Sequence, residues 1–183
     1  MFFPIGFYQA AEAAATAFGT PWTGRAATSS DNWRCITFAD SLFVMVAFGS
    51  GNRIATSSDG LTWTVRTSAA DNNWHAIAYG AGVYAVVSGT GSSNRVQTSP
   101  TGTTWTSRTS AADNEWTCIT YGGGLFVAIA ESGTDRVQTS PDGSTWTSRT
   151  AAANTEWLGV AFGAGLFAAV SATGTINRIM TAP

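Results

Sequence analysis

The residues of this chain that could carry out acid–base chemistry are few, and most of them recur at a fixed spacing. Glu115 and Glu156 each precede a tryptophan, and Asp31, Asp71 and Asp113 each stand close to an asparagine in the same kind of loop. Two carboxylates can hydrolyse a glycosidic bond when their surroundings hold their pKa values apart. Repetition gives every copy the same surroundings, so we expect these residues to stabilise the fold and we expect no catalysis.

The basic residues follow the same rule. There is no lysine, and eight of the nine arginines form two repeating series, which are Arg25, Arg66, Arg108, Arg149 and Arg53, Arg95, Arg136, Arg178. A residue that is present in every repeat is most simply explained by a role in every repeat. The single histidine, His75, has no cysteine cluster to complete a metal site. We also expect no cofactor, because no glycine run precedes a helix that could bind phosphate.

Eight tryptophans define the unit that must position these residues. Trp33, Trp74, Trp116 and Trp157 lie 41, 42 and 41 residues apart, and Trp22, Trp63, Trp105 and Trp146 keep the same intervals. A period of about 40 to 50 residues is typical of propellers and solenoids, whose units bury their apolar faces by stacking on their neighbours.

Each repeat contains the pattern of four short strands. In the third repeat, the β-forming runs 116–121 and 125–130 flank three glycines, and two further runs, 136–140 and 145–150, flank a turn of the sequence Pro-Asp-Gly-Ser. No helical periodicity separates them, which excludes the helical solenoids. The sequence therefore predicts an all-β fold, a four-bladed β-propeller of four-stranded antiparallel blades.

The two ends of the chain each contain part of one blade. Residues 177–183 match the third strand and the turn of an earlier repeat, and residues 20–26 match a fourth strand with nothing of its blade before it. We expect an N-terminal arm at 1–17 and a propeller at 18–183, with blades at about 33–67, 74–109, 116–150 and 157–183 plus 20–26. The N-terminal strand then closes the ring by completing the last blade. Exchange of this strand between copies in an oligomeric assembly is the alternative.

A turn motif links the third and fourth strands of each repeat. Its residues are Ser57, Asp59, Gly60 and Trp63 in the first copy, Gly102 and Trp105 in the second, and Ser140, Asp142, Gly143 and Trp146 in the third. The motif resembles the Asp-box, or BNR, repeat of sialidase-like β-propellers, with a departure at Thr101, where the aspartate is missing. The resemblance implies a structural turn on the blade periphery, so it implies architecture more than chemistry. A glycosidase of the sialidase type is the least favoured function.

The loops that join each blade to the next are the candidate ligand-facing surface. They carry Asp71, Asn72, Asp113, Asn114 and Asn154 close to the tryptophans. Short polar side chains beside aromatic rings suit sugar binding. A carbohydrate-binding propeller that acts alone is therefore the alternative function.

The N-terminal arm is the candidate partner-docking segment. Phe2, Phe3, Ile5, Phe7 and Tyr8 form an apolar head that has no counterpart in the repeats. Together with the alanine-rich spacer and the β-repeat body, this head is similar in style to small bacteriophage virion proteins. We therefore expect a structural or adhesive module of a virion, as a tail or capsid decoration component, with a virion or extracellular location.

The overall charge argues against two classes of partner. The formal net charge is −2, and no segment is long and apolar enough to cross a bilayer. A field this weak does not gather nucleic acid or an anionic membrane surface. We therefore expect no nucleic-acid and no membrane partner.

Removal of residues 1–26 tests the role of the N-terminal strand. If this strand completes the last blade, its loss exposes a strand edge and lowers the solubility or the melting temperature sharply. Thermal unfolding of the full-length and truncated chains measures the effect. An unchanged melting temperature would count against the pairing.

Overall fold

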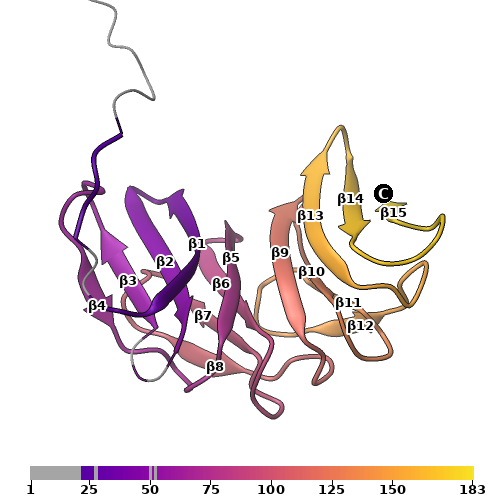
Figure 1. Ribbon diagram of the computed structural model, residues 1–183, viewed down its shortest axis with the longest axis horizontal. Coiled ribbons are helices and arrows are strands. Elements are labelled where there is room, and N and C mark those ends of the chain that lie inside the picture. The colour runs from indigo at the N-terminus through magenta and orange to yellow at the C-terminus, as the bar shows by residue number, and fades with distance from the viewer. Residues whose placement is uncertain (1–21, 27–28, 50, 52) are drawn as a thin grey trace, which may run out of the picture.

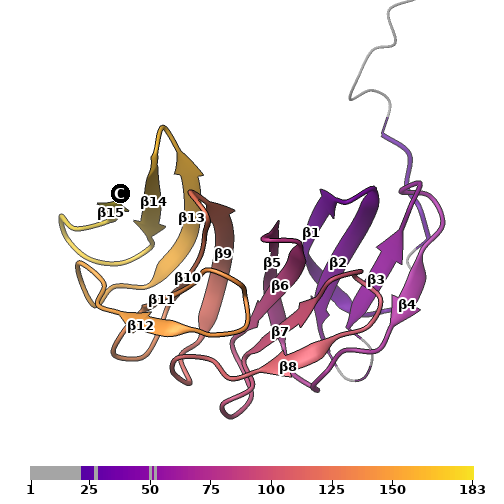
Figure 2. The ribbon, with the colours of Figure 1, turned by 180° about the vertical axis from the view of Figure 1, so that it is seen from behind.

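The computed structural model describes residues 22–26, 29–49, 51 and 53–183, which form an open arc of four antiparallel β-sheets (Figures 1 and 2). The predicted arm at 1–17 lies outside the described residues. Every regular element among the described residues is a strand. Accordingly, this part of the chain contains no helix with the length and apolar character needed to cross a membrane.

The four sheets follow one another along the chain, and each is one blade. Blade 1 contains β1 (Asn32–Ala39), β2 (Leu42–Phe48), β3 (Ile54–Ser57) and β4 (Thr64–Arg66). Blade 2 contains β5 (Trp74–Gly80), β6 (Val83–Ser88), β7 (Val96–Ser99) and β8 (Thr106–Arg108). Blade 3 contains β9 (Trp116–Gly122), β10 (Leu125–Ala130), β11 (Val137–Ser140) and β12 (Thr147–Arg149), and blade 4 contains β13 (Trp157–Gly163), β14 (Leu166–Ser171) and β15 (Ile179–Ala182).

Within a blade the strands pair in chain order, and the register is the same in each copy. Tyr79 pairs with Tyr84 in blade 2, as Phe162 pairs with Phe167 in blade 4. The first two strands are joined by a tight turn with positive φ, at Ala81 and Gly82 for example. This geometry suits two-residue hairpins, because its twist matches that of the strands.

The core lies between the blades, where one sheet packs face to face on the next. The first strands β5, β9 and β13 each pack against the first strand of the blade before, and their leading residues Trp74, Trp116 and Trp157 are fully buried. An apolar cluster between blades 2 and 3 contains Val87 and Ile119. Each blade is too thin to have a core of its own, so the stacking of blades provides the hydrophobic stabilisation.

A second tryptophan packs at each of the first two junctions, between blades 1 and 2 and between blades 2 and 3. Trp105 packs with Val44 of blade 1 and Tyr84 of blade 2, and Trp146 packs with residues of blades 2 and 3. Their indole Nε1 atoms donate to the carbonyl oxygens of Gly102 at 3.1 Å and of Gly143 at 2.9 Å. The tryptophan of one blade therefore fixes that blade to the preceding one.

The predicted all-β architecture with four blades is confirmed, and the predicted closure of the ring is not observed in this arc. The last sheet has three strands, residues 22–26 lie in no strand, and the side chain of Trp22 is 91% exposed. Closure requires β13 to pack on β1 as β9 packs on β5. Blades 1 and 4 instead lie at opposite ends of the arc (Figure 1).

Glycine at the end of a first strand is required by the ring that covers it. A Cβ at Gly80 would overlap the aromatic ring of Tyr121 from the next blade. We therefore expect Gly80→Ala to destabilise the protein by about 1–3 kcal/mol through overpacking, measured by denaturant unfolding. The control is Gly24→Ala, where a Cβ meets no atom within 4 Å. Equal stability of the two variants would contradict this account of the junction.

Candidate functional site

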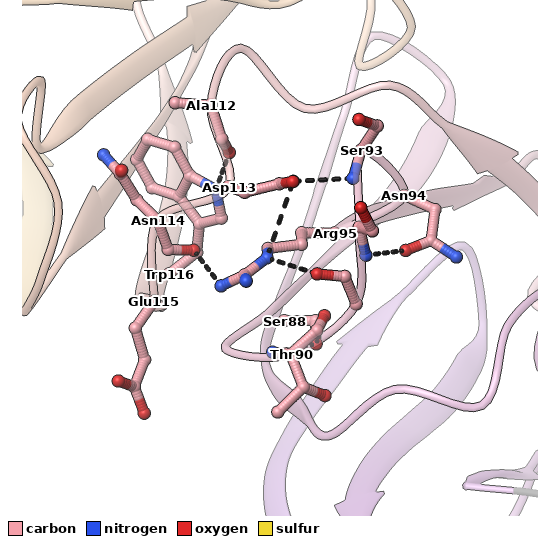
Figure 3. A network of polar contacts seen from close by, with 12 residues as sticks. Ser88, Thr90, Ser93, Asn94, Arg95, Ala112, Asp113, Asn114, Glu115 and Trp116 are labelled. Carbon is pink, nitrogen blue, oxygen red and sulfur yellow. Dashed lines mark hydrogen bonds and ion pairs between the residues drawn. The ribbon is translucent and has the colours of Figure 1, made fainter.

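The loop between blades 2 and 3 is held by a polar network around Arg95 (Figure 3). The Arg95 Nη1 atom donates to the carbonyl oxygens of Gly89 at 2.7 Å and Asn114 at 2.9 Å. The Oδ1 atom of Asp113 accepts from the backbone N–H of Ser93 at 2.6 Å and lies 3.6 Å from Arg95 Nε. Figure 3 shows that these groups point toward one another, so the network joins the loop after β6 to the loop before β9.

An equivalent arginine–aspartate contact occurs between blades 1 and 2. Arg53 is buried, and its Nη2 atom lies 2.8 Å from Oδ1 of Asp71, which also accepts from the Gly51 N–H. In the third junction Arg136 binds the carbonyl oxygens of Glu131 and Gly133. These arginines therefore bind the loops of their own fold.

The second arginine series lies along the outer strands. The Nε atoms of Arg66, Arg108 and Arg149 donate to the hydroxyl oxygens of Thr56, Thr98 and Thr139 at 2.9, 2.9 and 3.1 Å. Each pair joins the fourth strand of a blade to the third. This contact repeats once in each blade that has a fourth strand, so it is part of the sheet.

The loop residues expected to face a ligand separate into two groups. Asn72 and Asn114 are buried, and their side-chain amides donate to the carbonyl oxygens of Asn94 at 2.9 Å and Asp135 at 2.5 Å. They lie inside the loops, which differs from the solvent-facing orientation expected for them. The reason is that a buried backbone carbonyl requires a donor, and the asparagine amide supplies it. Asp71, Asp113 and Asn154 lie at the surface.

The two aspartate turns have one hydrogen-bond pattern. Oδ1 of Asp59 accepts from the backbone N–H groups of Thr62 and Leu61, both at 2.8 Å. These donors, with the Ser57 hydroxyl, lower the pKa of Asp59 to about 2. Asp142 accepts from Thr145 and Ser144 in the same way, which lowers its pKa. The two carboxylates therefore stabilise the turns by accepting hydrogen bonds from the turn backbone.

The titratable residues that do not repeat lie in a row near the starts of the first strands. The guanidinium of Arg34 lies 4.0 Å from the centre of the Phe48 ring, and the centres of the Phe48 and His75 rings are 4.3 Å apart. Burial lowers the pKa of His75 to about 4, although Glu115 opposes this shift. His75 is therefore neutral at physiological pH.

Glu115 and Glu131 form the carboxylate pair that repeat symmetry argues against. Burial raises the pKa of Glu131, and the charge of the neighbouring Glu115 raises it further. Sequence reasoning missed Glu131, although it breaks the repeat where blade 2 has Gly89 and blade 4 has Ala172. Among the residues that the structure describes, no group of three or more His, Cys, Asp or Glu side chains could hold a metal ion.

An apolar groove lies between blades 3 and 4. It has a volume of about 450 Å³. Its walls include Leu125, Val127 and Ile129 of blade 3, and Phe167 and Ala169 of blade 4. No aspartate or glutamate side chain lines this groove and most of its lining residues are apolar, so it is suited to an apolar side chain.

Four successive antiparallel sheets stacked face to face around an arc define a protein of the β-propeller class. Solved β-propellers are similar to it. YCF48 from Cyanidioschyzon merolae matches 86% of this chain and 55% of its own, with 15% identity and a TM-score of 0.62. YCF48 bound to D1 peptide matches 79% of this chain and 50% of its own, with 16% identity and a TM-score of 0.59.

A designed protein of similar length shares the fold. The computationally designed Ika4 protein matches 84% of this chain and 91% of its own, with 12% identity and a TM-score of 0.59. This chain spans about half the length of the two YCF48 chains. No family model and no curated protein matches the sequence. The likeness therefore establishes the fold class.

Removal of the Glu131 charge tests the carboxylate pair. The pKa of Glu131 is higher in the folded state than in the unfolded state. The contribution of Glu131 to the free energy of unfolding therefore falls as the pH rises from its unfolded-state pKa through its folded-state pKa. Glu131→Gln stays neutral, so we expect a small rise in melting temperature at pH 7 and no difference near pH 4. Thermal unfolding at both pH values measures this. A lower melting temperature at pH 7 would show that the Glu131 carboxylate is stabilising.

Proposed function

We propose that this chain is a non-catalytic, protein-binding β-propeller module that docks through its N-terminal arm into a larger assembly, such as a bacteriophage particle. The observation that carries the non-catalytic part is the use of the repeated polar residues inside the fold. Arg53 and Arg95 bind loop groups, and Arg66, Arg108 and Arg149 bind threonine hydroxyls. Side chains engaged in this way are not free to act on a substrate.

A protein partner is supported by the kind of propeller that this chain resembles. One of the similar structures is YCF48 bound to D1 peptide, a propeller with a bound peptide. Because the two sequences are only 16% identical, the likeness supports the class of partner and names no particular partner.

The arm is the proposed docking segment. Phe2, Phe3, Ile5, Phe7 and Tyr8 place five large apolar or aromatic side chains within eight residues. Burial of such side chains against a partner is favourable, and aromatic residues are common at the centres of protein interfaces. The virion assignment rests on the sequence style of this head, the alanine-rich spacer and the β-repeat body.

Truncation of the arm tests the proposal. We expect a chain that lacks residues 1–10 to keep its circular dichroism spectrum and melting temperature but to be lost from purified particles. The matched control is replacement of Phe2 and Phe3 by leucine, which keeps the apolar character and should keep incorporation. Normal incorporation of the truncated chain would contradict docking through the arm. Turnover of an aryl glycoside that is abolished by Glu115→Gln would contradict the absence of catalysis.

A further inference from the structure

The groove between blades 3 and 4 has the lining of a tryptophan slot. Trp105 lies in one buried apolar cluster with Val44, Val46 and Ile54 of blade 1 and with Tyr84 and Val86 of blade 2. The repeat places Val127, Ile129, Val137, Phe167 and Ala169 at these same five positions in blades 3 and 4, and all five line the groove. The slot that holds Trp105 in one junction is thus present, without its tryptophan, in another.

The sequence assigns a tryptophan to this slot. Trp22 precedes Trp63 by the same interval that separates Trp63 from Trp105, give or take one residue, and its side chain is 91% exposed. Arg25 follows Trp22 by the same three residues that separate Arg108 from Trp105. Its counterparts donate to a threonine of the third strand, and the corresponding threonine in blade 4, Thr181, lines the groove.

The two ends of the arc expose the apolar positions that internal junctions bury. On blade 1, Ile36 is 54% exposed, whereas its counterpart Ile77 is 5% exposed. On blade 4, Val170 is 52% exposed, whereas its counterpart Val87 is fully buried. Each end therefore has the surface of a junction without the facing blade.

One specific contact is also divided between the two ends. At internal junctions an aromatic ring covers a glycine of the preceding blade, as Tyr121 covers Gly80 and Phe162 covers Gly122. The corresponding glycine of blade 4 is Gly163, where a Cβ would meet no atom within 4 Å, and the corresponding ring of blade 1 is Phe38, which is 57% exposed. Phe38 and Gly163 are the two halves of this repeated contact.

We propose that a second copy of this chain supplies the missing contacts: two arcs form a ring in which each inserts its Trp22 strand into the blade 3–4 groove of the other. Blade 1 of one copy then packs on blade 4 of its partner, twice, through a twofold axis. The strand would pair with β15 in the register of blade 1, where Thr56 opposes Thr64, so that Thr181 opposes Thr23 of the other copy.

The open arc favours a second copy over insertion of the chain's own strand. Residues 22–26 precede blade 1, at the opposite end of the arc from β15 (Figures 1 and 2). Insertion within one chain would require blades 1 and 4 to meet, and this would change the angles of the packed junctions between them. Close-packed interfaces resist such changes. A second arc leaves them unchanged, and it also covers the free edge of β15.

The surface involved differs from the N-terminal arm, so the two proposals fail separately. We expect light scattering of the full-length protein to give a molar mass twice the 19.0 kDa of one chain. Trp22→Ala should raise the dimer dissociation constant at least about 30-fold, as for a central aromatic residue of an interface. The control, Leu61→Ala, removes another exposed apolar side chain, from the aspartate turn of blade 1, and should have no effect. A monomer at all accessible concentrations, or a larger assembly, would overturn the two-copy ring.

A disulfide identifies the source of the strand even if Trp22→Ala unfolds. Thr23→Cys with Thr181→Cys, in a chain with Cys35→Ala and Cys118→Ala, should oxidise to a covalent dimer on a non-reducing gel. The native cysteines are free thiols, and blade 2 has alanine at their position. The matched control, Thr56→Cys with Thr64→Cys, should close within one chain because these residues are paired in blade 1. A cross-link within one chain at positions 23 and 181, or none, would overturn the proposal.

Discussion

The burial of one blade face against the next is the interaction on which the rest of the structure depends. A single sheet of short strands has two faces and no interior, and it gains hydrophobic stabilisation when a neighbour covers a face. Trp74, Trp116 and Trp157 are fully buried at these contacts, and Trp105 and Trp146 pack at the first two of them. Stability is therefore distributed over the junctions, and the blade at each end of the arc has one apolar face that no neighbour covers.

The polar residues serve the same junctions. Gln97 and Gln138 are fully buried, and each accepts a hydrogen bond from a backbone N–H of the loop that precedes its blade, Ala69 for one and Ala111 for the other. Such bonds prevent loop groups from being buried without partners as the apolar faces meet. The polar network at Arg95 and the packing of Trp116 are thus parts of one junction.

Two features of this chain depart from the repeat pattern of the blades. Glu131 has no acidic counterpart in the other blades, and burial together with the charge of the neighbouring Glu115 raises its pKa. Among the described residues the sheet of blade 4 has three strands, and the adjacent groove has the apolar lining that a tryptophan fills elsewhere. The first departure affects only the local electrostatics, whereas the second leaves one blade with an open apolar groove.

The sequence by itself determined the blades. Its tryptophans recur at intervals of 41 and 42 residues, and its strand and turn signals alternate in every repeat, so the pattern can be recognised from local sequence alone. It also identified the aspartate turns, whose donors lie within three residues of Asp59. The tertiary structure alone decided the orientation of Asn72, the meeting of Glu115 with Glu131, and the opening between blades 1 and 4. These depend on the angle between sheets and on contacts between residues distant in the chain, and a repeat pattern specifies neither, because the same repeats can stack into a closed ring or an open arc.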